Sequence, residues 1–183
     1  PRAAGLRGGG VRVKPIEFRP AEPGPLRALN LEYMAWIDAQ LAAHFGVSLV
    51  QVNGQSVEQY VDATLHKVCG EPPPRGCFHL LWRDGEYLGM GGLRTLEPGV
   101  GEIKRVYLRP AARGQGLAEA LMQRLLDDAR RFGLHSLRLD SAPFMPAAQA
   151  LYERLGFVDR APYPQTEVPL DFQGRWRFME RGL

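Results

Sequence analysis

A glycine-rich turn between a predicted strand and a predicted helix is the feature that most constrains the fold of this chain. The strand covers Glu102–Pro110, and the turn reads Arg113-Gly114-Gln115-Gly116-Leu117-Ala118. Apolar residues then recur at helical spacing, at Leu117, Leu121, Leu125, Ala129 and Phe132. The first turn of such a helix leaves about four backbone N–H groups unpaired and carries about half a positive charge. The sequence therefore predicts an anion-binding site at this turn.

The composition of the turn supports this prediction. Gly114 and Gly116 allow a ligand to approach the backbone and tolerate positive φ angles, and Arg113 can add a planar pair of N–H donors. Two nucleotide-binding motifs are excluded. A dinucleotide fingerprint needs a third glycine and follows the first strand, whereas this glycine pair lies in mid-chain. A Walker A loop needs a Gly-Lys pair, which the sequence lacks.

Three consecutive segments share the pattern of a known family. Arg113, Gly116 and Ala118 occupy the fixed positions of Q/R-x-x-G-x-G/A at the start of the predicted helix. The strand Glu102–Pro110 precedes them, and Ala148–Phe157 reads A-x-x-L-Y-x-x-x-G-F after them. In this order the segments resemble the GNAT superfamily of acyl-CoA-dependent N-acyltransferases. The resemblance implies acetyl-CoA as the co-substrate and direct attack of an amine on its thioester.

The resemblance also implies a fold. We expect an α+β, three-layer protein with a mixed, mostly antiparallel sheet of six to seven strands, a V-shaped split between the fourth and fifth strands, and helices on both faces. The length of 183 residues with 45% hydrophobic residues suits one globular domain. We assign residues 1–10 to a flexible, glycine-rich N-terminal segment and residues 11–183 to a single acetyltransferase domain.

Local patterns predict the individual elements. Val11–Phe18 is a first strand, a helix with apolar positions from Leu26 to Phe45 ends near Gly46, and Ser56 with Gln59 forms a capping box that opens a second helix up to Gly70. Asp84-Gly85 joins the strands 77–83 and 86–96 in a tight hairpin. The later elements are a strand around Leu137–Asp140, a helix at Pro146–Leu155, a strand at Phe157-Val158 and a strand at Trp176–Arg181.

Composition restricts the cellular setting and the partners. Interrupted apolar stretches and the lack of a signal-peptide core predict a cytoplasmic protein without a membrane partner. The net charge is +3, but acidic and basic residues are interleaved, which disfavours a nucleic-acid partner. Cys69 and Cys77 lack disulfide or zinc spacing and the four histidines are scattered, so we expect reduced thiols and no metal. A thiol nucleophile built on Cys69 or Cys77 lacks an evident orienting Asn or Asp.

Two residues are candidates for catalysis by the resemblance. Glu102 is expected to deprotonate the amine, and Tyr152 to protonate the sulfur of the leaving thiolate. A carboxylate near pKa 4.3 and an ammonium near 10.4 differ by about six pKa units, so Glu102 needs desolvation or an intervening water. The alternatives for Glu102 are an ion pair with Lys104 or Arg105 and a solvated position at an edge. The alternative for Tyr152 is a packing role beside Leu151 and Leu155.

The cofactor site is expected along the fourth strand and the turn. Simple alternation fits Glu102–Leu108 poorly, which suggests a bulge that exposes backbone donors near Val106 to the thioester; an ordinary strand is the alternative. The expected cofactor-binding residues are Val106, Tyr107, Leu108, Arg113, Gly114, Gln115, Gly116, Leu117 and Ala118. One position departs from the family pattern, because Met145 stands where an Asn usually contacts the pantetheine arm.

The acceptor is the least constrained partner. We expect a small molecule or peptide with a primary amine, bound between the first two helices and the loop Ala161–Gly174, where Glu167 and Asp171 offer charge and Tyr163 and Phe172 offer packing. A catalytically silent acyl-CoA-binding sensor is the alternative to an N-acetyltransferase. A homodimer formed through the C-terminal strand is a further hypothesis.

Overall fold

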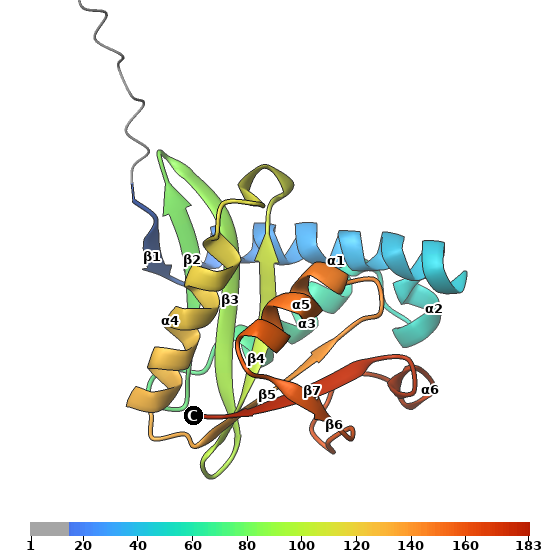
Figure 1. Ribbon diagram of the computed structural model, residues 1–183. Helices are drawn as coiled ribbons and strands as arrows, with labels where there is room; N and C mark the ends of the chain where they lie inside the picture. Colours follow the sequence, from blue (N-terminus) through green and yellow to red (C-terminus); the bar gives the residue numbers. More distant parts are fainter. Residues whose placement is uncertain (1–14) are drawn as a thin grey trace, which may run out of the picture.

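The computed structural model describes residues 15–183 (Figure 1). The expected flexible segment 1–10 and the first part of the predicted strand Val11–Phe18 lie outside the described residues, so the expected domain boundaries stay a prediction. The elements, in order, are β1 Glu17–Pro20, α1 Pro23–Phe45, α2 Leu49–Asn53, α3 Val57–Cys69, β2 Gly76–Arg83, β3 Glu86–Glu97, β4 Val100–Leu108, a 3-10 turn Pro110–Ala112, α4 Leu117–Arg131, β5 Ser136–Ser141, α5 Pro146–Arg154, β6 Val158–Arg160, α6 Leu170–Gln173 and β7 Arg177–Gly182.

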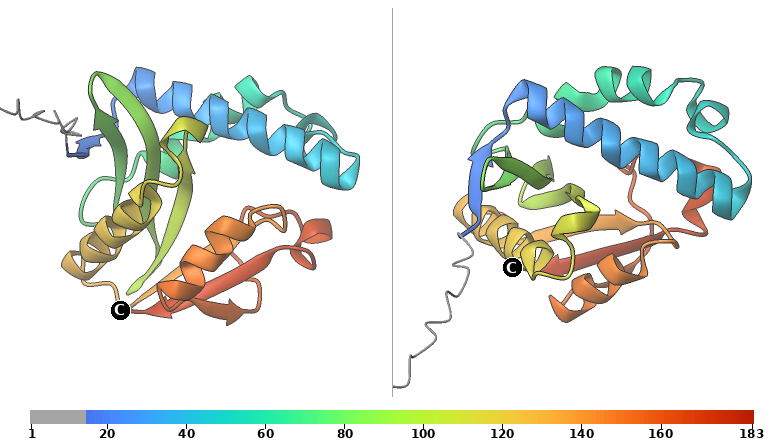
Figure 2. Two further views of the ribbon diagram at one scale, coloured as in Figure 1. Left: turned by 45° about the horizontal axis from the view of Figure 1, so that its top comes forward. Right: turned by 90° about the horizontal axis from the view of Figure 1, so that it is seen from above.

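The strands form one sheet of seven strands in the order β1-β2-β3-β4-β5-β7-β6. All neighbours are antiparallel except β4 and β5, which are parallel. This parallel pair is short, since it joins only Val100–Glu102 to Ser136–Arg138. Beyond Glu102 the two strands diverge, as Figure 2 shows. The fold and its split between the fourth and fifth strands are confirmed.

Helices cover both faces of the sheet (Figure 2). On one face α4 packs with Leu121, Leu125 and Leu126 on the central strands in the main hydrophobic core. On the other face α1 and α3 pack on β2, β3 and β4, with Leu29 and Val68 in a second core. A third apolar cluster joins α1, α2 and α3 to residues 142–145 and to the segment around α6. Apolar clusters therefore lie on both faces of the sheet, on either side of the split between β4 and β5.

Most local predictions agree with the structure. The capping box is present, because the Gln59 N–H donates to Ser56 Oγ at 3.2 Å and the Ser56 N–H donates to Gln59 Oε1 at 3.0 Å. Gly46, in the left-handed conformation at φ 68°, ends α1. Asp84 and Gly85 both have positive φ angles, as the predicted tight hairpin requires. The first strand differs, since β1 begins at Glu17 and does not include Ile16.

Strand β4 contains a β-bulge. The pairing with β3 jumps from Gly92–Lys104 to Met90–Tyr107, so Arg105 and Val106 together oppose a single residue, Gly91. Arg105 has a positive φ of 55°, which side chains with a Cβ rarely adopt. The bulge thus lies where β4 leaves β5, at the opening of the split.

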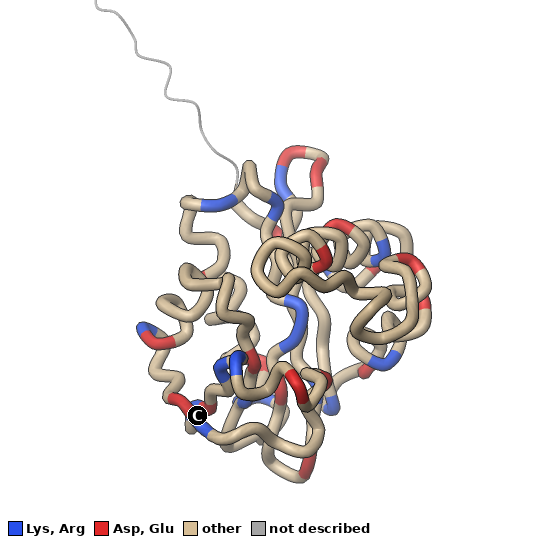
Figure 3. The backbone as a smooth tube through the Cα atoms, turned by 90° about the vertical axis from the view of Figure 1, so that its right-hand side faces the viewer, with Lys and Arg blue, Asp and Glu red and all other residues tan. Residues whose placement is uncertain are grey.

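The charges and edges of the molecule bear on its partners. Acidic and basic segments are interspersed over the face seen in Figure 3.

Strand β7 pairs with β5 on one side and with β6 on the other, so a dimer built by strand pairing would use another strand. A homodimer stays a prediction. Within residues 15–183 no helix is both long and apolar enough to cross a membrane. The cytoplasmic location also stays a prediction.

Candidate active site

A cavity of about 430 Å³ lies between β4, the glycine-rich turn and α5. Its wall contains every expected cofactor-binding residue except Gln115. The bulge and the end of β4 contribute Val106, Tyr107 and Leu108, and α5 contributes Ala148, Leu151 and Tyr152 from the opposite side. We call it the larger cavity. It is the space created where β4 and β5 separate.

The turn has the backbone geometry that its sequence predicts. Gly114 and Gly116 have φ angles of 72° and 74°, and Gly116 is the N-cap of α4 without a side-chain capping bond. A Cβ at either glycine would meet no protein atom within 4 Å, so the backbone faces open space. Arg113 donates from Nε to the Leu108 carbonyl at 3.1 Å. Gly116, Leu117 and Ala118 at the start of α4 line the larger cavity, so their backbone N–H groups form a candidate anion cradle.

Gln115 supports the turn from outside the cavity. Its side-chain amide donates to the Ala111 carbonyl at 3.0 Å, and its Oε1 accepts from Arg83 Nη2 at 2.7 Å. Its side chain thereby ties the turn to the end of β2. The structure gives Gln115 a supporting position that its place in the motif alone does not reveal.

Tyr152 lies on the wall of the larger cavity and is only 6% exposed. Its ring packs near Phe157, with the ring centroids 6.0 Å apart. Burial raises the pKa of the Tyr152 hydroxyl, and Tyr33 and Asp140 raise it further. A tyrosine with a raised pKa keeps its proton at neutral pH and can donate it in a hydrogen bond.

A smaller cavity of about 170 Å³ adjoins the first one. It is enclosed by α1, α2, α3, the bulge of β4, the end of β5 and the segment 167–176. Tyr33 and Met145 line both cavities. The residue that departs from the family pattern, Met145, thus stands at the junction of the two. Of the residues expected around the acceptor, Glu167 and Phe172 line the smaller cavity, and Tyr163 and Asp171 do not.

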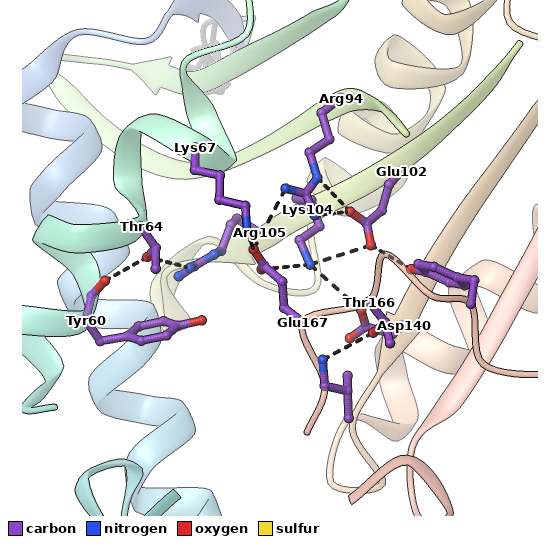
Figure 4. Close-up of polar contacts among 12 residues, drawn as sticks. Tyr60, Thr64, Lys67, Arg94, Glu102, Lys104, Arg105, Asp140, Thr166 and Glu167 are labelled. Atoms are coloured by element: carbon purple, nitrogen blue, oxygen red, sulfur yellow. Dashed lines mark hydrogen bonds and ion pairs between the residues drawn. The ribbon is translucent and has the colours of Figure 1, made fainter. Parts of the chain in front are cut away.

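Charged side chains form a network at one end of the smaller cavity (Figure 4). Lys104 lies between Glu167, Glu102 and Asp140, with Nζ–O distances of 3.2, 3.7 and 3.8 Å. Lys104, Asp140 and Glu167 line the cavity. These groups come from β4, β5 and the segment before α6, which are distant in sequence.

Burial and pairing shift the pKa values of these groups. Burial lowers the pKa of Lys104, but Asp140, Glu102 and Glu167 reverse this and raise it to about 12. Burial raises the pKa of Asp140 above its ordinary value although Lys104 opposes the effect. Burial also acts on Glu167, but Lys104 and Arg94 outweigh it and lower its pKa. Lys104 is thus a fixed cation, and of the two carboxylates on the cavity wall only Asp140 has a pKa raised above its ordinary value.

Glu102 lies beside this network but behind the cavity wall. Its side chain is fully buried and is not part of the lining of either cavity. Arg94 donates to Glu102 Oε2 at 2.8 Å, and the Tyr163 hydroxyl donates to Oε1 at 2.6 Å. The sequence reasoning missed both partners, which come from β3 and from the segment after β6. The role of Glu102 as a base stays a prediction.

A second polar cluster ties α4 to β2. His79 Nε2 lies 2.6 Å from Asp128 Oδ2, and the Cys77 thiol donates to the same oxygen at 3.6 Å. The sequence pattern did not reveal an acidic residue that could orient a thiol–histidine pair. In the structure Asp128 contacts both Cys77 and His79. Burial and Asp128 raise the pKa of Cys77 to about 12, which opposes a nucleophilic thiolate. Arg124 and Arg131 also bind Asp128, so its charge is already compensated.

Comparison with known proteins places the chain in a family. The sequence profile of the acetyltransferase (GNAT) family matches residues 33–157, which is more than half of the chain. The uncharacterized N-acetyltransferase YjgM of Escherichia coli is 32% identical over 141 residues, covering 72% of this chain and 80% of that protein. The chain belongs to the GNAT acetyltransferase family.

Other relatives agree with this assignment. The IAA acetyltransferase of Azospirillum brasilense is 37% identical over 103 residues, covering 55% of this chain and 64% of that protein, which is less than two thirds of its length. A GNAT-family acetyltransferase structure from Staphylococcus aureus has a TM-score of 0.69 at 17% identity, covering 92% of this chain and 99% of the other. The PaiA N-acetyltransferase of Thermoplasma acidophilum, solved in complex with coenzyme A, has a TM-score of 0.65 at 16% identity, covering 93% and 100%.

Proposed function

We propose that this protein transfers the acetyl group of acetyl-CoA to a primary amine of a small molecule, by direct attack in a ternary complex. The observation that carries the proposal is the pair of adjoining cavities. One lies beside an anion cradle, the other contains carboxylates, and both share Tyr33 and Met145. A thioester in the first cavity and an amine in the second would meet at these two residues.

The lining of the larger cavity suits the chemistry of coenzyme A. The N–H groups of the turn from Arg113 to Ala118 would bind the pyrophosphate, as helix N-termini bind phosphate groups. The apolar wall of α5, with Ala148 and Leu151, would face the pantetheine arm. Acetyl-CoA would supply the activated acyl group. The coenzyme A complex of a protein with the same fold supports this choice of co-substrate.

The carboxylates of the smaller cavity would receive the amine. Asp140 and Glu167 are on the wall, and the raised pKa of Asp140 narrows the gap to an ammonium group. Glu102, the base expected from the resemblance, is held by Arg94 and Tyr163. Those contacts favour a positioning role, in which Glu102 fixes Arg94 and Lys104 around the cavity. We propose that Glu102 acts on the amine only through these neighbours.

Tyr152 would serve the leaving group. Tyr152 is a residue of α5 and lines the cavity that lies between α5 and the bulge. This position suits a hydroxyl that donates to the thiolate sulfur of coenzyme A. Its burial excludes bulk water from that bond, which strengthens it. The backbone donors at the bulge, near Val106, would stabilise the oxyanion that forms when the amine attacks the thioester.

The test has two independent parts. Calorimetry measures binding of coenzyme A, and a thiol-release assay measures turnover of acetyl-CoA with amino acids, polyamines, aminoglycosides and peptides. We expect saturable binding in the first part and amine-dependent thiol release in the second. Failure to bind coenzyme A would refute the proposal. Binding of coenzyme A without turnover of any acceptor would favour the silent acyl-CoA sensor. In that case the contacts of Glu102 with Arg94 and Tyr163 would explain why it does not act as a base.

A further inference from the structure

Arg105 is a buried cation that makes no hydrogen bond or ion pair with a carboxylate of residues 15–183, although its charge helps to lower the pKa of Glu167. It is 9% exposed, and its Nη1 atom has no hydrogen-bond acceptor among residues 15–183. Its Nη2 atom makes one long bond, to Thr64 Oγ1 at 3.4 Å. The guanidinium otherwise lies near the rings of Tyr33 and Tyr60, at 6.0 and 5.7 Å from their centroids. A buried arginine normally has an anion or several acceptors, because desolvation of its charge is costly.

The nearby carboxylates are engaged by other cations (Figure 4). Glu102 is bound by Arg94, and Glu167 is bound by Lys104 at 3.2 Å and Arg94 at 3.8 Å. Asp140 lies 3.8 Å from Lys104. The guanidinium of Arg105 points away from this network toward Thr64 and Tyr60, on the helical side of the smaller cavity. The cavity thus has a paired end and an unpaired cationic end.

The backbone holds Arg105 in this position. It is a residue of the β4 bulge, and its positive φ costs about 1 kcal/mol for a residue that has a Cβ. The bulge directs the side chain between α1 and α3 rather than into the sheet ladder. A strained residue whose charged side chain lines a cavity is typical of a binding site.

We propose that Arg105 binds a carboxylate of the acyl acceptor, so that the acceptor is an amino acid rather than a simple amine. The inference rests on the proposed function and names the substrate class of its acceptor site. The planar fork of the guanidinium suits a carboxylate. The amine of the same molecule would face Asp140 and Glu167 at the other end of the cavity.

The remaining wall restricts the side chain of that amino acid. Met34, Ile37, Leu41, Phe172 and Trp176 make it predominantly apolar. The volume of about 170 Å³ is below the ~300–1,000 Å³ of sites for drug-sized ligands. The structure therefore fits a small α-amino acid with an apolar side chain, and excludes long polyamines and peptides from full enclosure.

The experiment compares amino acids with their decarboxylated counterparts, namely leucine with isoamylamine and phenylalanine with phenethylamine. Thiol release from acetyl-CoA gives kcat and KM for each acceptor. For the unmodified protein we expect kcat/KM at least tenfold higher for the amino acid of each pair. In Arg105→Met we expect kcat/KM for the amino acid to fall about 100-fold, mainly through KM, because a charge-assisted pair is lost. In the same variant, kcat/KM for the matching amine should fall by a much smaller factor than kcat/KM for the amino acid.

Two further variants control for damage to the fold. Arg138→Met removes another largely buried arginine, on β5, which pairs with Glu97 and does not line the cavity. It should leave the amino-acid preference unchanged. Arg105→Lys keeps the charge without the planar fork and should restore part of the amino-acid activity. Thermal unfolding of each variant identifies any that fails to fold.

The outcomes separate this inference from the proposed function. Equal use of amino acids and amines by the unmodified protein, or equal loss of both in Arg105→Met, would overturn the inference and leave the acetyltransferase intact. If no acceptor is turned over, calorimetry with leucine in the presence of coenzyme A decides. Saturable leucine binding that Arg105→Met abolishes supports the carboxylate site, and no binding to the unmodified protein refutes it.

Discussion

At the scale of single residues, the Tyr152 hydroxyl is the group with the most specific expected role. Tyr152→Phe should lower kcat about 100-fold, because a general acid contributes ~10²–10⁴-fold to a rate. The KM for acetyl-CoA should change little, since the ring still fills the cavity wall. Steady-state thiol release measures both quantities. Unchanged turnover would leave Tyr152 with a packing role beside Phe157.

Glu102 offers a second prediction at this scale. Glu102→Gln removes the buried charge that Arg94 and Tyr163 contact, and should lower the free energy of unfolding by about 3 kcal/mol. Urea unfolding measures this change. The same substitution at Glu97, which is partly exposed and pairs with Arg138, should cost less than about 1 kcal/mol.

The pH dependence of Glu102→Gln separates the two roles of this residue. As a positioning residue, Glu102 would leave the acidic limb of the pH–rate profile in place while kcat falls. Loss of that limb in the variant would identify Glu102 as the base itself.

Single residues were predictable from the sequence where a motif names them. Tyr152 and the turn residues other than Gln115 line the cavity beside the turn. The contacts of Glu102 were not predictable, because Tyr163 is 61 residues away and the sheet order that joins them is not encoded in any local pattern. The buried, unpaired state of Arg105 was not predictable either, because no sequence pattern distinguishes such an arginine from one that is exposed or paired.

At the scale of elements, the turn before α4 can be tested with a matched pair of glycines. Gly116 begins α4 and Gly133 follows its end, with φ angles of 74° and 75° and no protein atom within 4 Å of a Cβ in either case. Alanine at either position should therefore cost a similar ~1–2 kcal/mol in the free energy of unfolding.

Only Gly116→Ala should weaken binding of coenzyme A, by about tenfold or more, because only this methyl group would stand in the anion cradle. Thermal unfolding and calorimetry with coenzyme A measure the two effects. Equal affinities in the two variants would show that the cradle does not bind the coenzyme.

The contact of α4 with β2 gives a prediction on pH. Asp128 is 4% exposed; burial alone would raise its pKa, but His79 and Arg124 lower it below the ordinary value. A carboxylate with a depressed folded-state pKa stabilises the fold above its unfolded pKa of about 4 and loses this effect as the pH falls through the folded value.

Asp128→Asn should therefore lower the free energy of unfolding by about 2 kcal/mol at pH 7, and the difference from the unmodified protein should shrink at pH 3. Urea unfolding at both pH values measures it. Asp127→Asn is the control, because that exposed neighbour contacts Arg130 and Gln123 at the surface. A loss that is equal at both pH values would assign the effect to packing rather than to charge.

Element prediction from sequence depended on length. The capping box of Ser56 and Gln59 was recognised because a helix of 13 residues follows it. The same chemistry at Ser48 and Gln51 caps α2, but that helix has five residues and no apolar periodicity to mark it. Helix α6 has four residues and could not be predicted from the sequence for the same reason.

At the scale of the whole molecule, the adjoining cavities predict the kinetic mechanism. Because the two adjoining cavities would hold both substrates of the proposed reaction at once, initial-rate plots against acetyl-CoA at several acceptor concentrations should intersect. A covalent acetyl-enzyme is not expected, since burial raises the pKa of Cys69 to about 11 and that of Cys77 to about 12. Parallel lines, or acetylated protein in mass spectrometry without acceptor, would contradict this prediction.

The order of the strands is the part of the architecture that local sequence determines least. The hairpin of β2 and β3 follows from a short connection, and the crossover from β4 to β5 follows from the helix α4 between them. The insertion of β7 between β5 and β6 depends instead on which edge remains available after the rest of the sheet has formed. The resemblance to a family supplied the overall fold, which those patterns alone leave open.

The bulge in β4 reverses the parity of the strand. Ile103 and Val106 lie three positions apart and yet both pack in the core with α4, while Tyr107 packs on the side of α1. Without the bulge, strict alternation would place Ile103 and Val106 on opposite faces and exchange the faces of every residue that follows, because strand side chains alternate with a period of two. Tyr107 and Leu108 would trade sides, and no substitution of side chains could repair the exchange. The one extra residue in the bulge thus determines which side chains of β4 line each of the two cavities.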